Sequence, residues 1–171
     1  MPSLLDSLKA DLIRALQLLG LIRSRMNQDK IYNTALSLIG YDASPRNEAP
    51  DMYACAETVS SIVRKALPEL RFPVITGTSE LFDYLDRSPS FTRVISPEHG
   101  DIIISPTGTG NGVLPHGHTG IIGNNTSPDG SLWIMSNDSR TGTLEVNFTL
   151  DSWHRFYGTR GGYPVFIFRV D

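Results

Sequence analysis

A single cysteine, Cys55, stands in the segment 51–60 (DMYACAETVS), where the apolar pattern predicts the start of an amphipathic helix. Backbone N–H groups at a helix N-terminus, with the positive end of the helix dipole, favour a thiolate over a thiol. A thiolate is a strong nucleophile, so Cys55 is the candidate nucleophile of a covalent mechanism. The alternative is a small buried hydrophobe, because Cys55 shares the inward stripe of this helix with Val59 and Ile62.

A nucleophilic thiol needs a base, and His118 is the leading candidate. It opens the predicted strand 118–123 (HTGIIG), in which alternate side chains point to opposite faces of a sheet. An imidazole that faces the thiol can take its proton and later return it to a leaving amine. His116 is the reserve base. The alternative for His118 is a hydrogen-bonded structural histidine.

A third polar group should hold the imidazole in the useful tautomer. Asn137 and Asp138 follow the predicted strand 132–136, and either could reach back to His118 across a hairpin. The alternative is a simple Asn-Asp turn.

Other polar groups near these motifs give weaker indications. Tyr53 could donate a hydrogen bond or line a cleft, although a packed surface tyrosine explains it equally well. His116 and His118 would need a third metal ligand that the sequence does not supply. A lone cysteine also excludes a cysteine-based zinc cage and a disulfide within the chain. We therefore expect neither a metal nor a cofactor.

These residues need a framework that brings a helix start against a strand. Helical patterns dominate the first half of the chain and strand patterns the second, which predicts an α+β fold with N-terminal helices and a central antiparallel sheet. Asp51 is the expected N-cap of the cysteine helix. The predicted helices are a leucine-rich segment up to residue 20, 27–39, 51–67, 79–86 and 150–156. The predicted strands are 92–95, 101–105, 118–123, 132–136, 143–146 and 164–170.

Leucines recur at helical spacing near the N-terminus, and Gly20 is expected to break or weaken that helix. Their expected role is core packing. The alternative is a helical arm that docks on a partner protein or meets a membrane surface. The leucines are Leu4, Leu5, Leu8, Leu12, Leu16 and Leu19.

The bulk composition narrows the possible partners. The 171 residues carry a formal net charge of −3 at pH 7, which gives no basic footprint for nucleic acid. No apolar run approaches the roughly 20 residues of a membrane span. Charges at positions 6, 9, 11 and 14 interrupt any signal-peptide core. We therefore expect a monomer that is made in the cytoplasm without a signal peptide.

Three motifs, in order, resemble those of the NlpC/P60 and CHAP group of papain-like cell-wall peptidases. Segment 55–60 (CAETVS) is similar to the group's nucleophile motif, 100–104 (GDIII) to its Gly-Asp strand, and 118–122 (HTGII) to its histidine strand. The usual Asp-Cys-Ser-Gly is absent, since alanine follows the cysteine. Asn137 looks like the CHAP asparagine more than the NlpC/P60 histidine.

The resemblance covers roughly residues 31–171 and implies a papain-like fold. We divide the chain into an N-terminal helical extension, residues 1–26, and a papain-like cysteine hydrolase domain, residues 27–171. The family implies hydrolysis of bacterial peptidoglycan, within the stem peptide or at the muramoyl–L-alanine amide, with no cofactor. The implied site is Cys55 as nucleophile, His118 as base and then acid, Asn137 as orienter, the Cys55 backbone N–H in the oxyanion hole, and Tyr53, His116 and Asp138 as substrate-binding residues.

The absence of a signal peptide suits a phage endolysin or a virion-associated lysin, which reaches the cell wall after release or as part of the particle. Two alternative enzymes keep the fold and change the substrate: a transglutaminase-like acyl-transfer enzyme and an interbacterial amidase toxin. A non-enzymatic alternative is a phage structural or assembly module in which Cys55 is merely packed.

Overall fold

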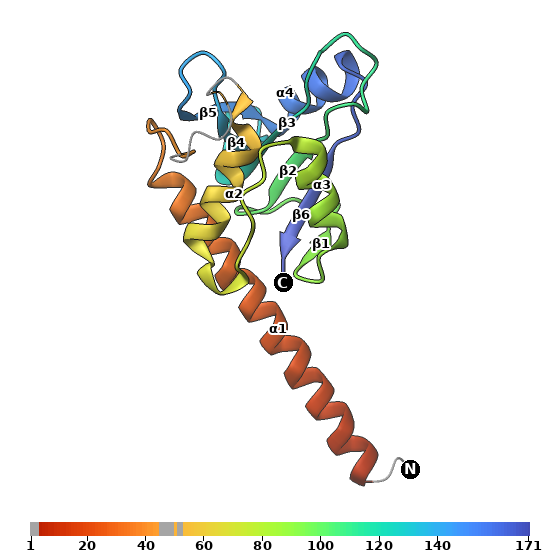
Figure 1. Cartoon of the computed structure of the whole chain (residues 1–171). Helices are drawn as coiled ribbons and strands as arrows, with labels where there is room; N and C mark the ends of the chain where they lie inside the picture. The colour runs from red at the N-terminus through yellow and green to blue at the C-terminus, as the bar shows by residue number, and fades with distance from the viewer. Residues whose placement is uncertain (1–3, 45–49, 51–52) are drawn as a thin grey trace.

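The computed structural model describes residues 4–44, 50 and 53–171 of the chain. Within these residues, six strands form an antiparallel sheet in the order β1-β6-β2-β3-β4-β5 (Figure 1). The predicted α+β class with a central antiparallel sheet is confirmed. The strands are β1 (Phe91–Arg93), β2 (Ile102–Ser105), β3 (His118–Thr126), β4 (Leu132–Asn137), β5 (Leu144–Thr149) and β6 (Phe166–Val170).

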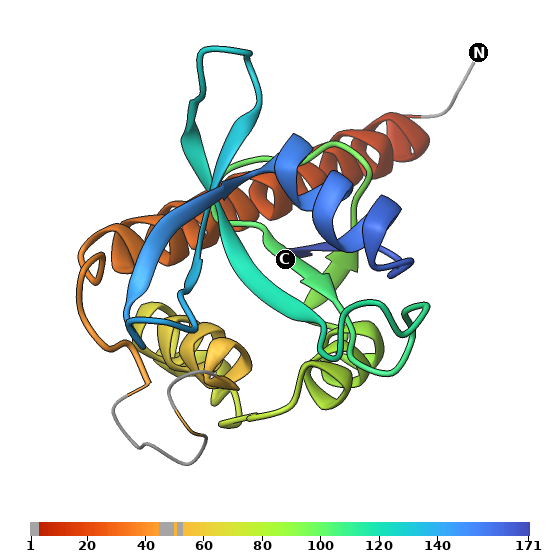
Figure 2. The same cartoon turned by 90° about the horizontal axis from the view of Figure 1, so that it is seen from above.

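Helices cover both faces of this sheet. The helices are α1 (Leu4–Leu36), α2 (Cys55–Ala66), the 3₁₀ turn η2 (Pro68–Leu70), α3 (Thr78–Arg87), α4 (Leu150–Trp153) and the π-helical η3 (His154–Arg160). The end of α1 packs with α2 and α3 on one face, and α4 and η3 lie on the other (Figure 2). The result is three layers with the sheet in the middle.

Strand alternation explains how a short run of isoleucines serves both faces. Ile102 and Ile104 of β2 belong to the core under α1, α2 and α3, whereas Ile103 belongs to the core under α4 and η3. Successive side chains of a strand point to opposite faces, so a strand that is covered on both sides is apolar throughout. On β3, His118 and Ile122 share parity and therefore lie on the α4–η3 side.

Helix α1 runs without interruption through Gly20, so of the two expectations for this glycine the break is wrong and a weakened helix remains. Glycine inside a helix costs about 1 kcal/mol relative to alanine, which weakens a helix without ending it. The separately predicted helix 27–39 is the C-terminal part of the same helix, which ends at Leu36.

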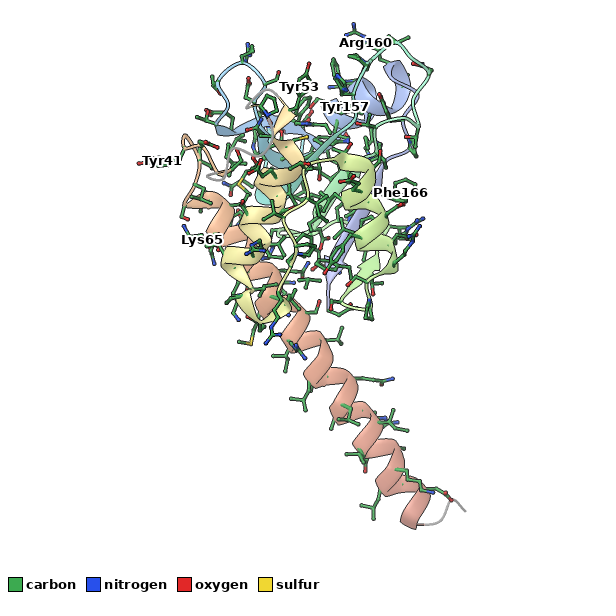
Figure 3. All side chains as sticks on the ribbon, in the orientation of Figure 1. Tyr41, Tyr53, Lys65, Tyr157, Arg160 and Phe166 are labelled. Atoms are coloured by element: carbon green, nitrogen blue, oxygen red, sulfur yellow. The ribbon has the colours of Figure 1, made fainter. Side chains whose placement is uncertain are left out.

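The leucines of α1 at positions 8, 12, 16 and 19 are exposed, and the core-packing interpretation is therefore wrong for them. Residues 6–23 are all exposed, and Leu8, Leu12 and Leu19 retain 58%, 61% and 61% of their accessible surface. The cause is geometric: this half of α1 extends past the end of the sheet, and its side chains project into solvent (Figures 1 and 3). Buried side chains begin at Asn27 and continue at helical spacing.

A polar contact fixes the buried half of α1 to the sheet. Asp101 is fully buried at the start of β2, and its carboxylate accepts hydrogen bonds from Gln28 of α1 and from Arg169 of β6. Gly100, just before it, has a φ of +82°, and a Cβ there would overlap the backbone of Gln28. A buried carboxylate is tolerated when it is paired and hydrogen-bonded in this way. The Gly-Asp motif therefore has a structural role.

Within the described part of the chain, no helix, α1 included, combines the length and apolarity that crossing a membrane requires.

Candidate active site

Cys55 is the first residue of α2, with Ala54 at the N-cap and no side-chain cap. The predicted N-cap, Asp51, lies outside the described residues, and the helix begins four residues after it. Val59 and Ile62 of α2 pack in the core against the sheet, and this contact carries the start of α2 towards the N-terminal end of β3. The side chain of Cys55 is nearly covered, with 8% of its surface exposed.

One cleft, of about 960 Å³, contains all six residues that the sequence predicts for the site. It lies between the start of α2, the loop before β3, the end of β4 and helix η3. Tyr53 and Tyr157, which line it, both lie at the end of the molecule away from the exposed half of α1 (Figure 3). The predicted residues along its walls are Tyr53, Cys55, His116, His118, Asn137 and Asp138.

The Cys55 thiol lies against backbone N–H groups but is also shielded from water. The N–H groups of Thr119, Ala56 and Cys55 itself favour the thiolate, as expected at a helix start. Burial acts more strongly in the opposite direction and raises the pKa of the thiol to about 11. The expected thiolate is therefore not the resting form at neutral pH.

His118 is held between aromatic rings. Its imidazole stacks on Trp153 and Tyr157, with ring centroids 5.4 and 5.5 Å apart. This burial lowers the pKa of His118 to about 4, although the negative charge of Asp138 acts in the opposite direction. The imidazole is consequently neutral at pH 7, which is the protonation state that a general base requires.

The polar neighbour of His118 in this structure is Ser136. Nε2 of His118 lies 3.0 Å from Oγ of Ser136, which is fully buried and lies 2.6 Å from Oδ1 of Asn147. Asn137 is the next residue of β4, so its side chain points to the other face of the sheet, on the α2 side of the cleft. The orienting role of Asn137 stays a prediction.

Asp138 and the mouth of the cleft supply further polar groups. The Asp138 carboxylate accepts a hydrogen bond from Arg140 at 3.0 Å, and this contact lowers its pKa. The rings of Tyr53 and His116 meet edge to face with centroids 4.9 Å apart. Both side chains are exposed, so they form a rim that an incoming ligand would touch.

Sequence reasoning did not assign Tyr157, Phe148 or Ser136 to the site. Tyr157 and Phe148 line the cleft, and fully buried Trp153 supports His118 from behind. The sequence held one indication of Ser136. It is a polar residue on an apolar strand, two positions after Ile134, and so lies on the same face, towards α4 and η3. No group of three or more His, Cys, Asp and Glu side chains that could hold a metal occurs among the residues that the structure describes.

No protein-family model matches this chain, and no curated protein shows significant sequence similarity to it. The cleft itself is therefore the main basis for assigning a function.

Proposed function

We propose that this protein is a papain-like cysteine hydrolase that cleaves amide bonds of bacterial peptidoglycan. One observation carries the proposal: a thiol at a helix start and an imidazole on the adjoining strand line a single cleft. The thiol lies against the backbone N–H of Thr119, the residue after His118, so the Cys55 sulfur sits beside the start of β3. A thiol and a neutral imidazole together make a nucleophile and its base.

The mechanism begins from two neutral groups. His118 accepts the Cys55 proton as the sulfur attacks the amide carbonyl, and it returns that proton to the leaving amine. Water then hydrolyses the thioester, with His118 again acting as base. Both groups are shielded from water, so neither becomes charged before the attack. The imidazolium of His118 forms together with the oxyanion of the substrate, whose negative charge balances it.

Two groups of donors are available to the oxyanion that forms in this step. The backbone N–H groups at the N-terminus of α2 have no acceptor within the helix, and those of Cys55 and Ala56 lie against the sulfur. Donors fixed before the reaction stabilise developing negative charge without reorganising. Burial raises the pKa of Tyr157, and the negative charge of the Cys55 thiolate raises it further, so the Tyr157 hydroxyl borders the same space.

Peptidoglycan as the substrate is supported by the order of the three motifs and by the open, polar-rimmed cleft. A phage endolysin or a virion-associated lysin is the setting we propose for this activity. The exposed half of α1 is proposed to dock on a partner, because nine large apolar side chains in residues 8–26 have no cover.

Digestion of purified sacculi tests the proposal. Wild type should release soluble fragments that mass spectrometry identifies as products of amide cleavage. Cys55→Ala and His118→Ala should release roughly 100-fold less, because each removes a group that takes part in the reaction. His154→Ala is the matched control, since His154 is exposed and lies outside the cleft.

Three outcomes separate the possibilities. Equal release by all variants would rule out Cys55 and His118 as the reactive pair. Loss of activity in His116→Ala with activity retained in His118→Ala would transfer the base to the reserve candidate. No release by wild type would exclude this substrate.

One observation favours a second candidate, a phage structural or assembly module with a non-catalytic domain. The raised thiol pKa and the lowered imidazole pKa are also what a packed, unreactive pair would show. A module of this kind would leave sacculi and small amide substrates intact, and its stability would fall in Cys55→Ala.

A further inference from the structure

The use of His118 as a base depends on which ring nitrogen carries the proton. Nε2 lies 3.0 Å from the Ser136 hydroxyl oxygen. A hydroxyl can donate or accept a hydrogen bond, so this contact alone permits either tautomer. The direction is decided one contact further away, at Asn147.

Asn147 leaves the Ser136 hydroxyl a single choice. Nδ2 of Asn147 lies 3.4 Å from the backbone carbonyl oxygen of Ser136, which can only accept. The amide nitrogen must therefore face that carbonyl, and Oδ1 must face the hydroxyl, 2.6 Å away. An amide oxygen also only accepts, so the one proton of the Ser136 hydroxyl is donated to Asn147.

We infer that Ser136 and Asn147 hold His118 in the tautomer that carries its proton on Nε2 and leaves Nδ1 free as the base. With its own proton committed to Asn147, the Ser136 oxygen accepts from Nε2–H. The nitrogen that remains for the Cys55 proton is Nδ1. Ser136 and Asn147 are positioning residues that act through His118, and this assignment rests on the proposed function for the use of Nδ1.

The burial of Ser136 makes this selection effective. Ser136 is fully buried, so water does not compete for its hydroxyl. Trp153 and Tyr157 also restrict rotation of the imidazole by stacking on it. A ring fixed in plane and bonded at one nitrogen presents the other nitrogen in a constant direction.

Long-range ¹H–¹⁵N NMR at pH 7 reads the tautomer directly. The His118 signals are assigned by their absence in His118→Ala. Wild type should show a protonated Nε2 and a bare Nδ1. Asn147→Leu frees the Ser136 hydroxyl to donate, so the population should shift towards Nδ1–H. Asn147→Asp keeps an acceptor for Ser136 and should retain the wild-type tautomer.

The same variants should separate in activity. We expect kcat to fall roughly 100-fold in Asn147→Leu and in Ser136→Ala with little change in KM, and to recover in Asn147→Asp. Ser105→Ala is the matched control, because Ser105 is equally buried and pairs with His118 across the sheet, yet its hydroxyl bonds Trp153. It should lose stability without changing the tautomer.

Two results would overturn the inference: a predominant Nδ1–H in wild type, or the wild-type tautomer retained in both Asn147→Leu and Ser136→Ala. If Ser136→Ala does not fold, the pair of Asn147 variants decides the question alone, since Asn147 is only half-buried. The spectrum needs no substrate, so an inactive wild type with the expected tautomer would reject the proposed function and keep the tautomer assignment.

Discussion

The thiol and the imidazole at the centre of the cleft are both neutral at pH 7. Burial raises the pKa of Cys55 to about 11 and lowers that of His118 to about 4. Each shift disfavours the charged form, so the two groups resist becoming an ion pair in the free protein. A protein of this kind would react with substrate that fills its cleft and remain largely inert to small thiol reagents.

The raised pKa of Cys55 and the lowered pKa of His118 predict how the reactivity of the thiol changes with pH. Iodoacetamide should label Cys55 at pH 7 at least 100-fold more slowly than in urea-unfolded protein, because the folded thiol loses its proton only near pH 11 and is shielded. The rate should rise about tenfold per pH unit above neutrality. Fast labelling at pH 6 would instead reveal a thiolate–imidazolium pair.

Activity on sacculi should have a single acid limb. Below pH 4 His118 becomes protonated and can no longer accept the Cys55 proton, so kcat/KM should fall as pH drops through about 4. Between pH 5 and 9 neither group changes its charge, and kcat/KM should be level. A limb near pH 6.5 would indicate a solvated histidine as the base.

Residue type and order in the chain point to Cys55 and His118 as candidates, and both line the cleft. The partner of His118 was not predictable in the same way, because it depends on the register between two strands. Gly120 pairs with Ser136, and this register places Ser136 on the face of His118 and the neighbouring Asn137 on the other. A shift of one residue in the register between β3 and β4 would exchange Ser136 and Asn137 as the neighbour of His118, and the sequence alone does not show this register.

At the scale of elements, the contact between α1 and β2 explains the Gly-Asp strand. Asp101 binds Gln28 and Arg169, and Gly100 allows the α1 backbone to approach closely. The motif therefore helps to hold the helix on the sheet, and the proposed reaction site lies one strand away.

Two glycine variants test this role. Gly100→Ala should destabilise the protein by several kcal/mol, because it combines a left-handed backbone with overlap of the Gln28 backbone. Gly108→Ala has a nearly equal φ of +85° and open space around it, so it should cost only about 1–2 kcal/mol. Urea unfolding measures both. Equal losses would show that the α1 backbone yields to the added methyl group.

The helices and strands were largely predictable from periodicity, and two features were not. The extent of α1 depends on glycine being too weak a breaker, and the exposure of its leucines depends on where the sheet ends. The local sequence pattern predicts neither the length of α1 nor the exposure of its leucines, since the same leucine spacing is found on buried and on exposed helix faces.

At the scale of the molecule, the structure consists of a three-layer body and a projecting helix (Figure 1). If the exposed half of α1 makes no contact with the body, Leu12→Glu and Leu19→Glu should change the free energy of unfolding by no more than about 0.5 kcal/mol. Ile31→Ala, on the buried half, should cost about 2–5 kcal/mol. A loss of similar size in the leucine variants would show that the arm folds back onto the body in solution.

Tyr53 and Tyr157, which line the cleft, lie at the end of the molecule opposite the exposed half of α1 (Figure 3). From Leu4 to Met26 the helix is about 33 Å long, at 1.5 Å per residue. A partner bound to the N-terminal end of α1 would hold the cleft at a fixed distance from the attachment point and facing away from it. Each residue inserted into or removed from the exposed half of α1 would change that distance by about 1.5 Å and rotate the cleft by about 100° around the helix axis.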